Sequence, residues 1–448
     1  MKLLIKNAFV VNEGVVSKND VLIIDKRIEK IQKSIKSESD WQIIDASGMY
    51  LIPGLIDTHV HFREPGLTYK GTIESESMAA IAGGVTSFMD MPNTRPNTTT
   101  IDLLEEKYAL ASKSSYANYS FYFGLNSENF ETAICIDNSK VCGLTDDGLY
   151  FDNNDSLMCN NLSYIDKLFS RSKSLIALHC EDESIIQKNE KLYFQKYGSL
   201  IPPEKHALIR NDVACFDSTK RVVDLAKKYN SRLHILHLST GIEVDLFSPL
   251  MDVRNKRITV EACMHHLYFN TTSYTSKGNQ IKWNPSIKSE NDRQALINGL
   301  NNGYIDNIAT DHAPHTIMEK SGDYFSCMSG APSIQHLLPV LLTLRKKGEL
   351  SIESIVQKTS HNPAEIFRIK QRGYIREGYY ADLVLIDLNH HVNMDTNKLY
   401  YKVGWSPFDN DKLQNPIRKV IVNGAIVLDE DGFTGQKDSM RLQFDSIR

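Results

Sequence analysis

The sequence predicts an α/β protein: a (β/α)8 TIM-like barrel with a small composite β-sandwich domain formed by both termini. Three observations predict it. Segments rich in short strands stand at the two ends of the chain, apolar runs alternate with amphipathic stretches between them, and polar side chains follow the apolar runs. The expected division is 1–50 and 366–448 for the composite β domain and 51–365 for the barrel.

Short strands separated by turn residues fill the first fifty residues, in the runs LLIKNAFVVN, VLIIDKRIEKI and QIIDASGMYLI. Similar material returns in 373–388 and in 418–432, where Asn423-Gly424 between apolar runs predicts a hairpin turn. No helical period persists in the first of these segments. We therefore expect one small β domain that both ends of the chain complete.

Eight apolar runs lie between these segments and predict the strands of the barrel. They are LIPGLIDTHVHF, VTSFMDM, NYSFYFG, KVCGLT, SLIALHC, RLHILHLS, ITVEACMHH and IDNIATDHAPH. Helical spacing of apolar residues appears in 101–114, 217–230, 291–303 and 333–347. A doubly wound sheet is the alternative, but no glycine-rich phosphate loop follows the first run.

Composition limits the class of protein. With 41% hydrophobic residues, 24% charged residues and a mean hydropathy of −0.32, the chain is neither disordered nor a membrane protein. The net charge is −4 and no basic run occurs, so we expect a small-molecule substrate as partner, with no nucleic acid and no membrane. The sequence does not determine the oligomeric state, and a homodimer is one possibility.

The cysteines and the N-terminal residues bear on the compartment. Seven cysteines form no C-x-x-C pair, so we expect free thiols in a reducing environment. The first apolar run is too short for a secretory signal. Both observations predict a cytoplasmic protein.

Imidazoles and carboxylates follow the apolar runs at the position where barrel enzymes carry their reactive groups. His59 and His61 are two residues apart and face the same side of a strand, and His179, His237 and Asp311 end later runs. Imidazole nitrogens and carboxylate oxygens are ligands suited to Zn²⁺ and the other first-row divalent metal ions. Four histidines and one aspartate exceed the needs of one catalytic ion and predict two, bridged by a carboxylate.

Other histidines near these positions are interpreted differently. His234 points to the opposite face of the strand from His237, and His312 faces away from Asp311, so both are expected to be structural. His265 and His266 remain open between packing and a supporting role behind the metals.

The motifs resemble one known family. Similarity extends over PGLIDTHVHFREPG (53–66), AGGVTSFMDMPNTRP (82–96), ALHCED (177–182), HLST (237–240), KWNP (282–285) and ATDHAPH (309–315). Together they resemble the amidohydrolase superfamily, and specifically the class I dihydroorotases. The resemblance implies two zinc ions, with His59 and His61 on the first, His179 and His237 on the second, and Asp311 binding a metal and handling the proton.

The same resemblance implies the interconversion of N-carbamoyl-L-aspartate and L-dihydroorotate in pyrimidine synthesis. The substrate carboxylate suits a guanidinium, and Arg63 follows the metal histidines by one strand repeat, while Asn93 adds an amide donor. By resemblance, the remaining substrate contacts are His61, Asn284, His315 and the backbone near Gly330.

The chain departs from the commonest family pattern at the metal bridge. Many relatives carry a carboxylated lysine after the fourth strand, whereas this chain reads GLTDDG over 143–148, and a threonine cannot form a carbamate. Another branch of the family has T-D-D-G there, which favours Asp147 as the bridge. Asp146 and Lys140 stay open as alternatives.

The expected mechanism uses a hydroxide held by the metals to attack the C4 carbonyl of dihydroorotate. Asp311 takes the hydroxide proton and returns it to the departing ring nitrogen. Two other readings remain: another cyclic amidase (an allantoinase, hydantoinase or dihydropyrimidinase), or a catalytically impaired dihydroorotase-like scaffold.

Overall fold

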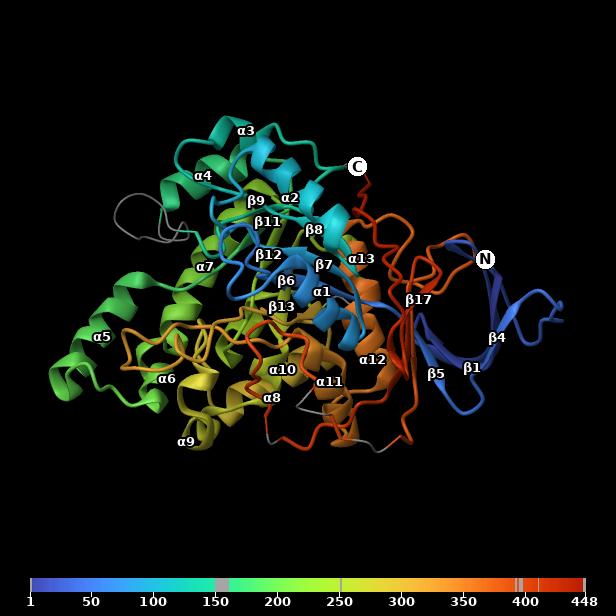
Figure 1. The fold of residues 1–448 in the computed structure, drawn as a ribbon. Helices are drawn as coiled ribbons and strands as arrows, with labels where there is room; N and C mark the ends of the chain where they lie inside the picture. Colours follow the sequence, from blue (N-terminus) through green and yellow to red (C-terminus); the bar gives the residue numbers. More distant parts are fainter. Residues whose placement is uncertain are drawn as a thin grey trace.

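A parallel barrel and a separate mixed sheet beside it make up the protein in the computed structural model (Figure 1). The structure describes residues 2–149, 161–249, 252–390, 393–394, 398–409 and 411–445. The mixed sheet combines strands from both ends of the chain, drawn in blue and in orange to red in Figure 1. The predicted fold class is thereby confirmed.

The small domain is built on a mixed sheet in the order β18-β17-β16-β15-β5-β1-β2-β3, with β4 beside β1. Its strands are β1 (Lys2–Asn12), β2 (Val15–Ile24), β3 (Arg27–Gln32), β4 (Gln42–Asp45), β5 (Tyr50–Pro53), β15 (Leu383–Ile386), β16 (Ile417–Val422), β17 (Ala425–Asp429) and β18 (Gly432–Phe433). The pairing of β5 with β15 joins the N-terminal strands to the C-terminal ones. Asn423 and Gly424, both at positive φ, form the predicted turn between β16 and β17.

The barrel strands are parallel and short. They are β6 (Leu55–Val60), β7 (Val85–Asp90), β8 (Asn118–Phe121) continued by β9 (Phe123–Gly124), β10 (Leu144–Thr145), β11 (Ile176–Leu178), β12 (Leu233–Ile235), β13 (Ile258–Cys263) and β14 (Asn307–Ala309). Backbone pairing of Val60 with His312 joins β6 to the residues after β14 and closes the ring. The His61 N–H donates to the His312 carbonyl there, at 2.8 Å.

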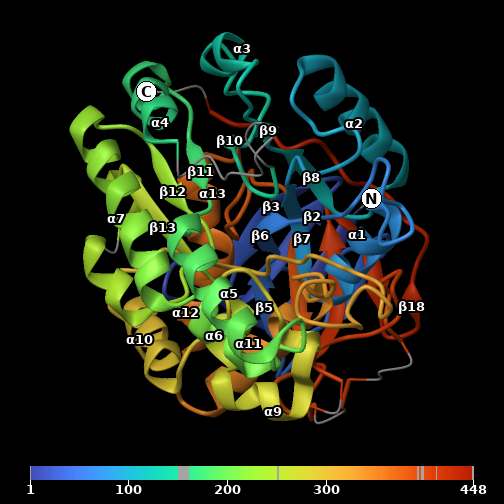
Figure 2. The ribbon, with the colours of Figure 1, turned by 90° about the vertical axis from the view of Figure 1, so that its left-hand side faces the viewer.

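Helices surround the strands, and α2, α4, α7 and α10 stand on the outside in Figure 2. The helices are α1 (Ile73–Ala82), α2 (Ile101–Ser114), α3 (Phe130–Ile134), α4 (Leu162–Arg171), α5 (Glu183–Tyr197), α6 (His206–Ile209), α7 (Asp212–Tyr229), α8 (Met264–Tyr268), α9 (Tyr274–Lys277), α10 (Glu290–Asn301), α11 (Leu337–Lys346), α12 (Ile352–Val356) and α13 (Asn362–Phe367). Helix α7 begins five residues before the predicted 217–230 because the Asn211 side chain accepts the Ala214 N–H and caps it there.

The run expected as the first barrel strand serves both sheets. Its start is β5 of the small domain and its continuation is β6 of the barrel, with Gly54 between them. A Cβ at Gly54 would lie 2.1 Å from Thr86 Oγ1 on β7, so only glycine allows this close approach. The chain therefore passes from one sheet to the other directly before the residues that carry the site.

Two further expectations concern the whole chain. The described part contains no helix that is both long and apolar enough to cross a bilayer. Six cysteines are free thiols, five of them buried, and Cys159 lies outside the described residues.

Candidate metal centre

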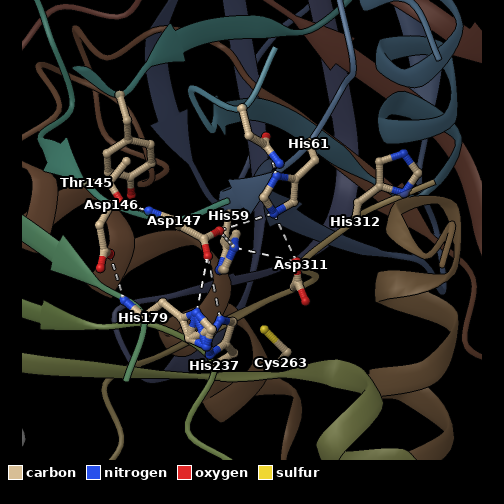
Figure 3. A network of polar contacts seen from close by, with 12 residues as sticks. His59, His61, Thr145, Asp146, Asp147, His179, His237, Cys263, Asp311 and His312 are labelled. Carbon is tan, nitrogen blue, oxygen red and sulfur yellow. Dashed lines mark hydrogen bonds and ion pairs between the residues drawn. The ribbon is translucent and has the colours of Figure 1, made fainter. Parts of the chain in front are cut away.

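Four imidazoles and two carboxylates meet at the C-terminal ends of the barrel strands (Figure 3). The six side chains, all buried, are His59, His61, Asp147, His179, His237 and Asp311. His59 lies in β6, and the other five lie one or two residues beyond the ends of β6, β10, β11, β12 and β14. The structure thus brings together the six side chains that the sequence analysis proposed as metal ligands.

Two of these residues have an unusual backbone conformation. His237 and Asp311 have φ values of 36° and 45°, in the left-handed region that residues with a Cβ rarely adopt. Arg63, two residues beyond His61, has a φ of 70°. Such conformations concentrate at functional sites, where the surrounding structure holds them in place.

The Asp147 carboxylate stands between the two pairs of histidines. Its Oδ2 atom lies 2.8 Å from His59 Nε2 and 3.2 Å from His61 Nε2. Its Oδ1 atom lies 4.0 Å from both His179 Nδ1 and His237 Nε2. Each pair of histidines therefore faces a different oxygen of one carboxylate, the arrangement required of a ligand that bridges two cations.

Asp311 approaches the first pair from the other side. Its Oδ1 atom lies 3.2 Å from His61 Nε2 and 3.5 Å from His59 Nε2. The donor atoms of His59, His61 and Asp311 lie within 4.8 Å of one another, and so do those of His59, Asp147 and His237. Buried imidazoles and carboxylates grouped in this way fit first-row divalent ions such as Zn²⁺.

The two alternatives to Asp147 lie elsewhere. The Asp146 carboxylate accepts the backbone N–H of His179 at 3.1 Å, and Figure 3 shows it turned to that backbone. The Lys140 side chain is 64% exposed and pairs with Asp137. The geometry supports Asp147 as the bridging candidate.

Hydrogen bonds behind three of the histidines fix which ring nitrogen faces the centre. Glu261 Oε1 lies 2.6 Å from His59 Nδ1, and Asn93 Oδ1 lies 2.8 Å from His61 Nδ1. Glu181 Oε2 lies 3.0 Å from His179 Nε2 and also pairs with Arg210. Each acceptor holds the N–H of its imidazole and leaves the other nitrogen free to bind a cation.

Sequence reasoning assigned no role to Glu261 or Glu181. Glu261 lies within β13, where it is the one charged residue of the strand ITVEAC, and its side chain is fully buried. A charged residue inside a buried strand requires a partner, which was the available signal. Besides His59, it contacts His234 Nε2 at 3.3 Å and Thr58 Oγ1 at 3.0 Å.

Burial and charge set the protonation of the ligands. Burial lowers the pKa of His179 and of His237 to about 4, which keeps both imidazoles in the neutral, metal-binding form near pH 7. Burial also opposes protonation of His59, but the carboxylates of Glu261, Asp147 and Asp311 outweigh it and raise its pKa well above the usual value. The centre is thus rich in negative charge, which a cation would balance.

We predict that Glu261→Gln weakens metal binding by roughly 10- to 100-fold, because glutamine accepts the His59 N–H without the charge that makes the imidazole a stronger ligand. Metal affinity is measured by competition with a chelator. Glu243→Gln is the matched control, since Glu243 is equally buried but bonds to Thr219 and Thr240. Equal metal affinity in the two variants would contradict the role of Glu261.

A cavity of about 630 Å³ opens in front of the centre. Its wall includes the expected substrate contacts, namely His61, Arg63, Asn93, Asn284, His315 and Gly330. The Asn93 amide oxygen faces His61 Nδ1, and the amide oxygen of Asn284 is buried without a hydrogen-bond partner in the described structure. A hydrogen-bond donor on a ligand would satisfy the Asn284 oxygen.

The remaining histidines take supporting positions. His312 contacts Glu76 at 2.8 Å, and His234 lies between Thr259 and Glu261. The His265 ring stacks on Trp283 with centroids 4.2 Å apart. His266 Nε2 lies 3.1 Å from the Pro285 carbonyl, so His265 and His266 pack behind the cavity wall.

Comparison with known proteins agrees with the barrel and its buried ligand groups. The model of the amidohydrolase family matches residues 50–427. A dihydroorotase of Methanosphaera stadtmanae is 32% identical over 441 residues, 98% of this chain and 98% of its own length. A dihydroorotase of Methanosarcina acetivorans is 30% identical over 443 residues, 96% of this chain and 93% of its own length.

Solved structures show the same fold. The L-hydantoinase (dihydropyrimidinase) from Arthrobacter aurescens superposes with a TM-score of 0.89 at 25% identity, over 98% of this chain and 99% of its own. The dihydropyrimidinase from Brevibacillus agri has a TM-score of 0.86 at 23% identity, with both chains fully covered.

The chain belongs to the amidohydrolase family. Within that family it is a dihydroorotase-like protein, a cyclic amidohydrolase of the dihydroorotase and dihydropyrimidinase group.

Proposed function

We propose that this protein is a dihydroorotase, which interconverts N-carbamoyl-L-aspartate and L-dihydroorotate in pyrimidine synthesis. The proposal rests mainly on the position of Arg63. Its guanidinium is buried and lines the same cavity as the candidate metal ligands. Dihydroorotate bears a carboxylate on its ring, whereas the cyclic amides dihydrouracil and allantoin do not.

Arg63 is suited to an anion. Its Nε–H donates to the Pro314 carbonyl at 3.2 Å, and its Nη2 atom lies 3.2 Å from His315 Nε2. Burial lowers the pKa of Arg63, which means that the charged form carries a desolvation cost. A substrate carboxylate offsets that cost through a paired, charge-assisted hydrogen bond.

Two zinc ions per subunit would be held by the six side chains at the strand ends, with Asp147 shared between them. His59 and His61 would serve the first ion, His179 and His237 the second, and Asp311 would complete the set. When bound, such ions lower the pKa of a coordinated water towards about 7 and polarise a carbonyl oxygen.

Asp311 handles the proton in this proposal. Its Oδ1 atom lies 3.2 Å from His61 Nε2, and Asp311 lines the same cavity as Arg63. In ring opening it accepts a proton from the attacking water and delivers it to the departing ring nitrogen. In ring closure the same carboxyl group protonates the oxygen that leaves as water.

Substituting Arg63 by methionine is expected to lower kcat/KM for dihydroorotate by roughly 10²- to 10³-fold, because the carboxylate loses a charged, paired donor in a buried site. The measurement compares steady-state kinetics on dihydroorotate and dihydrouracil. If kcat/KM for dihydroorotate survives the substitution, the substrate assignment is wrong.

A different cyclic amidase is the second candidate, favoured by the likeness in fold to the L-hydantoinase from Arthrobacter aurescens. Relative rates of the purified, zinc-loaded protein on dihydroorotate, dihydrouracil, hydantoin and allantoin separate the candidates. We expect dihydroorotate to be preferred, and preference for an uncharged ring would overturn the proposal. An impaired scaffold is disfavoured because all six metal-binding side chains are present.

A further inference from the structure

The imidazole of His315 has a basic side chain against each ring nitrogen. Arg63 Nη2 lies 3.2 Å from Nε2, and Lys70 Nζ lies 3.0 Å from Nδ1. All three side chains are buried and line the cavity. The motif reasoning assigned Arg63 and His315 to the substrate but gave Lys70 no role.

The two contacts cannot both be hydrogen bonds to a neutral ring. A neutral imidazole accepts at one nitrogen and donates from the other, whereas a guanidinium and an ammonium only donate. Burial, together with the charges of Arg63 and Lys70, places the pKa of His315 well below its usual value, so the ring is neutral. One nitrogen must therefore carry a proton and face a cation.

The surroundings favour Nδ1 as the acceptor. The Lys70 ammonium is fixed by an ion pair with Glu319 at 2.8 Å, and Glu319 in turn accepts the Thr316 N–H at 2.9 Å. A proton on Nδ1 would face this ammonium, and Glu319 Oε2, at 3.8 Å, is too far away to accept it. A proton on Nε2 instead lies at the cavity wall beside Arg63.

We propose that Lys70 is a positioning residue that holds His315 in its Nε2–H tautomer and so makes the site selective for cyclic amides that carry a carboxylate. Arg63 and His315 then present two N–H donors side by side. A carboxylate, which only accepts, satisfies both. The statement about substrate class rests on the proposed function, whereas the statement about the tautomer does not.

Without Lys70, the alternative tautomer becomes favourable. A proton on Nδ1 leaves Nε2 free to accept from Arg63, and the two side chains then bond to each other. A substrate carboxylate would have to break that bond and would gain one donor fewer. Lys70 thus acts on the substrate through His315.

The tautomer is measured directly by ¹⁵N NMR of the full-length protein labelled at histidine, and the His315 signals are assigned by their loss in His315→Gln. We expect Nε2–H in the wild type and Nδ1–H in Lys70→Met. Lys358→Met is the matched control, because Lys358 is also buried and, within the described residues, its ammonium donates to the Ile305 carbonyl at 2.6 Å. Nδ1–H in the wild type, or an unchanged tautomer in Lys70→Met, would overturn the proposal.

Kinetics test the consequence for substrate class. Lys70→Met should raise KM for dihydroorotate by roughly 10-fold, the effect of one hydrogen bond to a charged group, with kcat changed less than about twofold. Lys70→Arg, which also donates, should recover most of the loss. In a His315→Ala background, Lys70→Met should add nothing further. An equal effect of Lys70→Met on dihydrouracil, or an additive double variant, would contradict selection through His315.

The NMR and kinetic measurements together distinguish failure of the dihydroorotase assignment from failure of the role proposed for Lys70. If the wild type does not convert dihydroorotate but the tautomer changes as expected, the dihydroorotase assignment fails and the role of Lys70 in fixing His315 stands. If dihydroorotate is converted and the tautomer is insensitive to Lys70, the enzyme assignment stands and the role of Lys70 fails.

Discussion

Replacing Asp311 by asparagine is expected to lower kcat for dihydroorotate by about 10²- to 10⁴-fold, the contribution of a positioned proton-transfer group. Asparagine has the same shape but cannot accept the proton from water or return it to the ring nitrogen. Because Asp311 Oδ1 also lies 3.2 Å from His61 Nε2, the metal content of the variant is determined alongside its rate.

Asp306→Asn serves as the control for Asp311→Asn. Asp306 is also buried, directly before β14, but it pairs with Lys256 at 2.6 Å and accepts the Val260 N–H at 2.9 Å. We expect this control to lose thermal stability and to keep kcat. An Asp311→Asn protein that binds metal normally and turns over at the wild-type rate would refute the proton-transfer role.

The second large effect is expected on substitution of Asp147, the candidate ligand that would bridge the two metal ions. Asp147→Asn should bind fewer than two zinc ions per chain and lose about 10²- to 10³-fold in kcat/KM, since an amide cannot place a negatively charged oxygen against both histidine pairs. Metal stoichiometry is measured by elemental analysis after dialysis, and affinity by calorimetry.

Asp146→Asn is the neighbouring comparison. The Asp146 carboxylate accepts the backbone N–H of His179 at 3.1 Å, so we expect Asp146→Asn to keep two bound zinc ions and to lose less activity than Asp147→Asn. The reverse pattern, in which Asp146→Asn loses a zinc ion and Asp147→Asn keeps both, would move the bridge to Asp146.

The barrel and most of its site could be predicted because they follow from short-range regularities. Strand periodicity puts His59 and His61 on one face, and parallel strands bring their C-terminal ends to one edge of a barrel. The same rules placed His179, His237 and Asp311 nearby, and the structure groups all of them. The fold class needed only the alternation of apolar runs and helical stretches.

What could not be predicted depends on packing between distant segments. Glu261 supports His59 across 202 positions in the chain, and no local pattern connects the two residues. The division of one apolar run into β5 and β6 falls at Gly54, where Thr86 leaves no room for a Cβ, a restriction visible only in the folded structure. Lys70 reaches His315 over 245 positions, so its contact with the cavity wall also required the structure.

The seam that closes the barrel runs through the metal centre. Val60 pairs with His312 there, and Thr310 Oγ1 donates to Asp57 Oδ2 at 2.5 Å across 253 positions of the chain. His59 and His61 stand on one side of this seam and Asp311 on the other, so a cation bound by all three would link the first and last strands. The unfolded chain does not hold these side chains together, so metal binding would add its free energy to that of closing the barrel.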